Sequence, residues 1–275
     1  MTTTTEETKQ VNWQDRVRNR GHRGGVIAMH RSMVRYVLSP SDLITVVLLV
    51  LLLTFAWLLL LPYLGHLWVR IVDFGIHHLP LRAQLHVVTY HLGPYIRFEI
   101  PYPAMEAILP NILTWQITTG ATLALFVGTF FLPASFIPIT YLSRGILLLQ
   151  ASALVYFALI PAEFPHTPNS YLEGLFGSGM AIITVVPTLF GFTFFIFKFN
   201  LPQKIVLTAL TMAHLSLFLP LQILAQALVL QKTVMFMPVL YIAFGLPMEV
   251  LIIIAFYAWG MTWNFRALER KAPKI

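Results

Sequence analysis

The chain has no cysteine among its 275 residues and few charged side chains. The absence of cysteine excludes disulfide bonds, thiolate metal sites and cysteine nucleophiles, including those of sortase-like membrane transpeptidases. Charged residues make up 11% of the chain, against about 25% in an ordinary soluble domain. Hydrophobic residues make up 57% and the mean hydropathy is +0.75. This composition excludes a soluble globule, a disordered chain, a collagen and a coiled coil, and it predicts a multipass membrane protein.

Several motifs that carry chemistry are also missing from the sequence. There is no glycine-rich phosphate-binding loop, no Gly-x-Ser-x-Gly elbow and no pair of intramembrane aspartates. No apolar run carries paired histidines suited to haem, and no His-Glu-x-x-His pattern occurs. We therefore expect no cofactor and no metal, and the sequence favours a role other than that of an enzyme.

Six apolar runs are long enough to cross a membrane, which requires about 20 residues per helix. They cover residues 43–61, 112–132, 145–162, 176–197, 205–230 and 235–260. The predicted fold is an all-α integral membrane protein, with a six-helix transmembrane bundle at residues 43–260.

The basic residues predict the orientation of this bundle, because cytoplasmic loops are enriched in Lys and Arg. With both termini in the cytoplasm, 14 of the 18 basic residues lie inside. The outer ones are Arg70, Arg82, Arg97 and Lys232. The basic residues on both sides flank apolar runs. The predicted partner is therefore the lipid bilayer and not nucleic acid. We expect a bacterial inner membrane, with cytoplasmic segments at 1–42 and 261–275.

The segments outside the runs have patterns of their own. Residues 26–38 place apolar side chains at helical spacing, with Arg31 and Arg35 opposite, which predicts a cytoplasmic amphipathic helix. Residues 62–109 form the predicted outer cap. It begins with an amphipathic helix at 64–76 and continues with two strand-like runs, 85–92 and 95–100, around a Gly93-Pro94 turn. We predict a small β-hairpin there.

Histidine and acidic residues on the outer side are candidates for metal binding or acid–base chemistry. His66, Asp73 and His77 share one face of the amphipathic helix. Glu163 and His166 stand in a proline-rich loop between the third and fourth runs. The alternative is that these amphipathic side chains simply suit the headgroup region.

Two ionisable residues lie at membrane depth, where such groups are costly and often functional. His214 is in the fifth run and Glu249 in the sixth, at depths that allow them to pair. Three prolines near mid-membrane are predicted helix-break positions: Pro187, Pro220 and Pro247. Interrupted helices around a polar site are typical of secondary transporters; a His–Glu pair that only locks two helices is the structural alternative.

The second run carries small residues at four-residue spacing, namely Gly120, Ala124 and Gly128. Such spacing lets another helix approach closely, so we predict a packing seam within the chain or between subunits.

The sequence leaves three hypotheses for the function. The first is a non-catalytic subunit or assembly factor of a membrane complex, whose partners are other membrane subunits. The second is a transporter, either proton-coupled through the intramembrane pair or the permease half of an exporter. The third is a membrane enzyme acting on a lipid-linked substrate at the outer face.

Overall fold

The computed structural model describes residues 40–92, 94, 96–194 and 199–269 of the chain. The chain divides into two compact units, residues 1–43 and 44–275, and the first contributes only the start of helix α2 to the described residues. The predicted amphipathic helix at 26–38 and residues 270–275 lie outside the described residues. Helix α8 continues to Glu269, into the segment predicted as a cytoplasmic tail.

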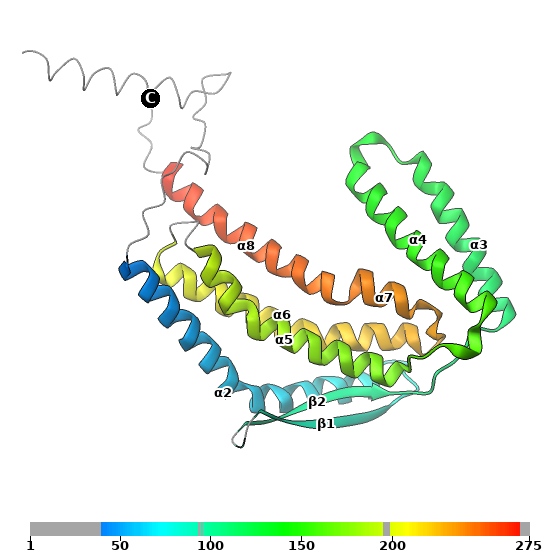
Figure 1. Cartoon of the computed structure of the whole chain (residues 1–275), viewed down its shortest axis with the longest axis horizontal. Coiled ribbons are helices and arrows are strands. Elements are labelled where there is room, and N and C mark those ends of the chain that lie inside the picture. The colour runs from blue at the N-terminus through cyan, green and yellow to red at the C-terminus, as the bar shows by residue number, and fades with distance from the viewer. Residues whose placement is uncertain (1–39, 93, 95, 195–198, 270–275) are drawn as a thin grey trace, which may run out of the picture. The chain divides into compact units, whose positions relative to one another are not determined.

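The described part of the chain is mostly helical and contains six helical segments long and apolar enough to cross a membrane (Figure 1). Four of the segments are single α-helices. The second consists of α3 and a 3-10 helix, Thr129–Phe131, and the sixth consists of a 3-10 helix, Val234–Phe236, followed by α7 and α8. The bounds are α2 Pro40–His78, α3 Ile112–Gly128, α4 Ile137–Leu159, α5 Pro168–Phe194, α6 Leu201–Leu230, α7 Met237–Phe244 and α8 Leu246–Glu269. The prediction of six membrane-length helices is confirmed.

Helix α2 is longer than its apolar run. Its 39 residues extend over about 58 Å at 1.5 Å per residue, about twice the hydrocarbon thickness. The amphipathic helix predicted at 64–76 is therefore the second half of α2. Trp68 and Val72 are buried on one side of this half, and Arg70 is exposed on the other. The helix ends just before Pro80, where a proline disfavours helical continuation.

Helices α4 and α5 each begin eight residues before their predicted starts. Arg144, predicted to lie in the loop before the third span, is inside α4. Its Nε donates to Thr129 Oγ1 at 3.0 Å and its guanidinium lies 4.2 Å above the Phe130 ring. A cation there complements the partial negative charge at the C-terminal end of α3. These contacts stabilise the positive charge of Arg144 inside α4. The apolar run used for the prediction excluded this charged residue, so the predicted helix began after it.

A two-stranded antiparallel hairpin follows α2, as predicted. It pairs β1 Gln84–Leu92 with β2 Ile96–Ala104. Phe98, Ile100 and Tyr102 of β2 are buried, and the strand packs mainly on α5. At Gly65, α2 lies so close to β2 that a Cβ atom would be 3.0 Å from the backbone nitrogen of Glu99. The hairpin thus rests on helices, which two strands need for stability.

Two of the three predicted helix-break positions are wrong. Helices α5 and α6 run without interruption through Pro187 and Pro220. A proline still frees the carbonyl four residues before it, and in α6 that carbonyl belongs to Ser216. The indole Nε1 of the fully buried Trp68 donates to this oxygen at 2.8 Å. A donor from α2 therefore replaces the missing backbone donor, and α6 stays continuous.

Candidate functional site

The sixth membrane-length segment is broken beside its third predicted proline. Helix α7 ends at Phe244 and α8 begins at Leu246, so the break lies at Gly245, two residues before Pro247. A Cβ atom at Gly245 would overlap the carbonyl oxygen of Tyr241. Glycine is therefore the residue type that fits this turn. The predicted helix-break positions did not include Gly245 because they were based on the prolines alone.

Side-chain amides from α6 bind the backbone carbonyls at this break. Gln222 Nε2 donates to Phe244 O and, at 3.4 Å, to Gly245 O. Gln226 Nε2 also donates to Phe244 O, at 2.7 Å, and its Oε1 accepts from the hydroxyl of Tyr171 in α5. Three helical segments are thus joined through a buried polar network. Such a network replaces hydrogen bonds that the interrupted helix cannot make in an apolar surrounding.

Glu249 follows the break by one helical turn and points into the bundle. Its side chain is 2% exposed. It lies against Gly179 of α5, where an added Cβ would be 2.7 Å from Glu249 Oε1, and the same Cβ would meet Leu219 of α6. Neither carboxyl oxygen has a hydrogen-bond partner within the described residues, and Gln222 Oε1 also has none. The carboxyl group is therefore enclosed where α5, α6 and α8 meet, without the contacts that normally satisfy it.

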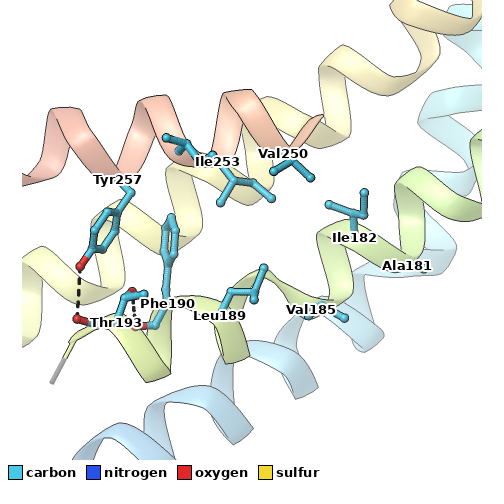
Figure 2. A pocket seen from close by; sticks show the side chains of 10 residues that line it. Ala181, Ile182, Val185, Leu189, Phe190, Thr193, Val250, Ile253 and Tyr257 are labelled. Carbon is cyan, nitrogen blue, oxygen red and sulfur yellow. Dashed lines mark hydrogen bonds between the residues drawn. The ribbon is translucent and has the colours of Figure 1, made fainter. Parts of the chain in front are cut away.

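Two cavities lie between α5 and the broken helix, one before and one after the level of Glu249. The α5–α7 cavity, of about 630 Å³, presents polar groups from Ser170, Tyr171, Ser178 and Tyr241. The α5–α8 cavity, of about 460 Å³, is almost wholly apolar. Figure 2 shows its α5 side chains facing those of α8, with Tyr257 donating to Thr193 O at one end.

His214 and Glu249 do not form the pair that their depths allow. The His214 side chain is exposed on the surface of α6. Its ring stacks on Phe218 and lies 5.1 Å from the Phe256 ring. His214 thus faces the surroundings of the bundle, whereas Glu249 faces its interior. The position of each residue in its apolar run predicts its depth along the helix, but it does not predict which face of the helix the side chain is on.

The outer-face candidates form pairs but no larger cluster. His66 Nδ1 lies 3.4 Å from Glu99 Oε2, and His77 Nδ1 lies 3.4 Å from Asp73 Oδ1. His77 also donates to the Asp73 carbonyl at 2.8 Å, which caps the end of α2. Among the described residues no group of three His, Asp or Glu side chains is arranged to hold a metal ion.

The loop candidates are separate from these pairs. His166 lines the α5–α7 cavity and its ring packs near Phe164, while Glu163 is exposed in a 3-10 helix, Pro161–Glu163. Within the described ranges no hydrogen bond or ion pair joins Glu163 to His166. The His166 imidazole therefore lines the cavity, and the Glu163 carboxylate, which was expected to act with it, does not.

The small-residue seam lies on the open side of α3. Gly120 and Gly128 have no atom within 4 Å of an added Cβ, and Ala124 is exposed. Thr122, the buried side chain of this helix, lies on a different face. The seam is therefore not a packing surface for any of the other helices that the structure describes.

Comparison of the chain with protein-family models, with curated proteins and with solved structures finds no match.

Proposed function

We propose that the chain is a membrane transporter in which Glu249 is the ionisable centre. The observation that carries this proposal is the enclosed Glu249 carboxyl group, whose two oxygens lack partners among the described residues. An unpaired buried carboxylate costs several kcal/mol, and a neutral carboxyl group still loses its hydrogen bonds to water. Gln150 of α4 is also buried without partners, but an uncharged amide is less costly. A proton or a cationic group bound at Glu249 would remove this cost.

The surroundings of Glu249 support transport over a purely structural role. Many transporters build their binding sites at interrupted helices near the membrane midplane. The sixth segment is interrupted at Gly245. The Phe244 and Gly245 carbonyls there accept from Gln222 and Gln226, and the polar group left free beside the break is Gln222 Oε1. The cavities before and after this level offer a polar and an apolar environment. They suit a solute that has both a cationic or proton-exchanging group and an apolar part.

Proteoliposomes containing the full chain test this proposal. Proton flux driven by a potassium diffusion potential, and uptake of the lipophilic cation tetraphenylphosphonium, would be measured for wild type, Glu249→Gln and His214→Gln. We expect Glu249→Gln to lose activity and His214→Gln to keep it, because His214 faces away from the site. Wild-type flux unchanged by Glu249→Gln, or no flux above protein-free vesicles, contradicts the proposal.

A second candidate function is that of a subunit or assembly factor of a membrane complex. The open small-residue seam on α3 favours it, since helices associate in membranes through such close contacts. Gly120→Leu should then reduce co-purification of membrane partners. Gly145→Leu is the matched control, because Gly145 of α4 also faces open space. Equal recovery of partners with both variants contradicts this role.

Both functions place the six helices across a bilayer, with the two termini in the cytoplasm. The asymmetry of the basic residues supports this orientation, and a bacterial inner membrane is the proposed location. Reporter fusions at residue 1 and residue 275 should both report the cytoplasm. Termini on opposite sides would contradict an even number of spans.

A further inference from the structure

A polar cavity lies where the ends of several helical segments meet the base of the hairpin. It measures about 1120 Å³. It lies beyond the ends of α2 and α6 and beside the starts of α5 and of the sixth membrane-length segment. Its polar lining residues are Arg82, Gln84, Glu106, Asn169, Gln231 and Lys232. These positions are far apart in the sequence, and no motif connects them.

Two of the amide side chains hold the walls of this cavity together. Gln231 Nε2 donates to Pro80 O at 3.0 Å, and Gln231 Oε1 accepts from the Arg82 backbone N–H at 3.1 Å. Asn169 Oδ1 accepts from the Met105 backbone N–H at 2.9 Å. The Gln231 contacts fix Arg82 next to the end of α6, where Lys232 follows directly in the chain. Two cationic side chains are thus brought to one cavity by hydrogen bonds that leave their charged groups unused.

The charge balance of the cavity favours an anion. Arg82 and Lys232 contribute two positive charges and Glu106 one negative charge. Ion pairs among the described residues join His66 to Glu99 and Asp73 to His77, and none involves Arg82 or Lys232. Both cations are exposed, so each can turn its head group towards a ligand. They are also half of the four basic residues predicted on this side of the membrane.

We propose that this cavity binds a phosphate-type oxyanion between Arg82 and Lys232. An arginine guanidinium binds phosphate through two parallel N–H donors, and a lysine ammonium adds a compact positive charge. Because the cavity lies at the ends of membrane-length helices, the phosphate belongs either to a lipid head group or to a free solute. The proposal does not depend on Glu249 or on the transport function, because it rests on other residues.

Two probes distinguish the source of the phosphate. Inorganic phosphate would be titrated calorimetrically into the full chain in a non-ionic detergent. Retention of phosphatidylglycerol over phosphatidylcholine would be followed by native mass spectrometry after release from mixed vesicles. Binding of inorganic phosphate supports a free solute, and selective retention of phosphatidylglycerol alone supports a lipid head group. Failure of the wild type to bind either probe overturns the proposal.

Four variants locate the site. Arg82→Gln and Lys232→Gln should each weaken binding about tenfold, the loss expected for one charge-assisted hydrogen bond. Arg97→Gln is the matched control, because Arg97 is an exposed arginine of strand β2 that does not line the cavity. Glu106→Gln should tighten binding severalfold by removing the opposing charge. This gain provides a test even if the loss variants fold poorly.

The outcomes of this series are unambiguous. Weaker binding in Arg82→Gln and Lys232→Gln, with the Arg97→Gln variant close to wild type, supports the site. An equal loss in all three shows a diffuse effect of surface charge and overturns it. Unchanged affinity of Glu106→Gln, with unchanged affinity of the two loss variants, overturns it as well.

Discussion

Gly179 and Glu249 meet at the contact between α5 and α8, where a Cβ atom on Gly179 would lie 2.7 Å from Glu249 Oε1. The space that glycine leaves open is therefore the space in which the carboxyl group is enclosed. Gly179 is part of a glycine-rich stretch of α5, in which Gly174 and Gly177 face open space instead. Of these three glycines, it is Gly179 that allows the Glu249 side chain to enter the bundle.

Gly179→Ala should destabilise the protein by about 1 to 3 kcal/mol, because the added methyl group overpacks a filled interior. Gly177→Ala is the control, since its methyl group meets nothing and alanine favours a helix by up to about 1 kcal/mol. Thermal unfolding in detergent should show a lower Tm for Gly179→Ala alone. Matching Tm values for the two variants would contradict the packing described at Glu249.

Gln226→Leu should lower the free energy of unfolding by about 1 to 3 kcal/mol. The substitution leaves the Tyr171 hydroxyl without its acceptor, and it leaves Gln222 as the remaining side-chain donor to the Phe244 carbonyl. Gln116→Leu is the control, since Gln116 is exposed on α3 and its side chain makes no hydrogen bond within the described part of the chain. Chemical unfolding followed by tryptophan fluorescence measures both. A loss in the control as large as that in Gln226→Leu would show that the network at the helix break is not the cause.

Trp68→Phe should destabilise wild type more than it destabilises a Pro220→Ala background. In wild type the Trp68 indole supplies the donor to Ser216 O that Pro220 cannot provide. With alanine at position 220, the helix has its own backbone donor for this oxygen. A double-mutant cycle on the unfolding free energy should give a coupling of about 1 kcal/mol. Additive effects would mean that the indole contributes through packing alone.

The hairpin should loosen from α5 at alkaline pH. The Tyr90 hydroxyl donates to Glu173 Oε1 at 2.6 Å, and this hydrogen bond, with burial and the Glu173 charge, raises the pKa of Tyr90 above its ordinary value of 10.0. A raised pKa in the folded state means that the contact is intact below pH 10 and is lost as pH rises through the raised pKa.

Ultraviolet titration of tyrosinate measures this shift. Glu173→Gln should move one tyrosine back towards its ordinary pKa, because the carboxylate charge is gone. Tyr90→Phe should remove the same late titration and serves as the assignment control. A titration curve that is identical in wild type and Glu173→Gln would rule out the contact between hairpin and helix in solution.

Much of the fold could be predicted from the sequence because it depends on properties of single segments. Length and apolar composition determine which helices can cross a bilayer, and the alternation around Gly93-Pro94 is sufficient for the hairpin. The depth of His214 and Glu249 along their helices follows in the same way. Helix ends were less predictable, since α4 accommodates Arg144 through contacts with Thr129 and Phe130, which follow the end of α3.

The tertiary structure decided where the polar residues face and which breaks occur. Pro220 leaves α6 continuous because Trp68, 152 positions earlier in the chain, supplies the missing donor, and Gly245 breaks the sixth segment because its backbone turns where no Cβ fits. His214 and Glu249 point to opposite environments, although they lie at similar depth. Arg82 and Lys232 share a cavity through the contacts of Gln231. The turn at Gly245 is a local backbone feature. The others depend on how distant segments pack together, which local hydrophobicity does not encode.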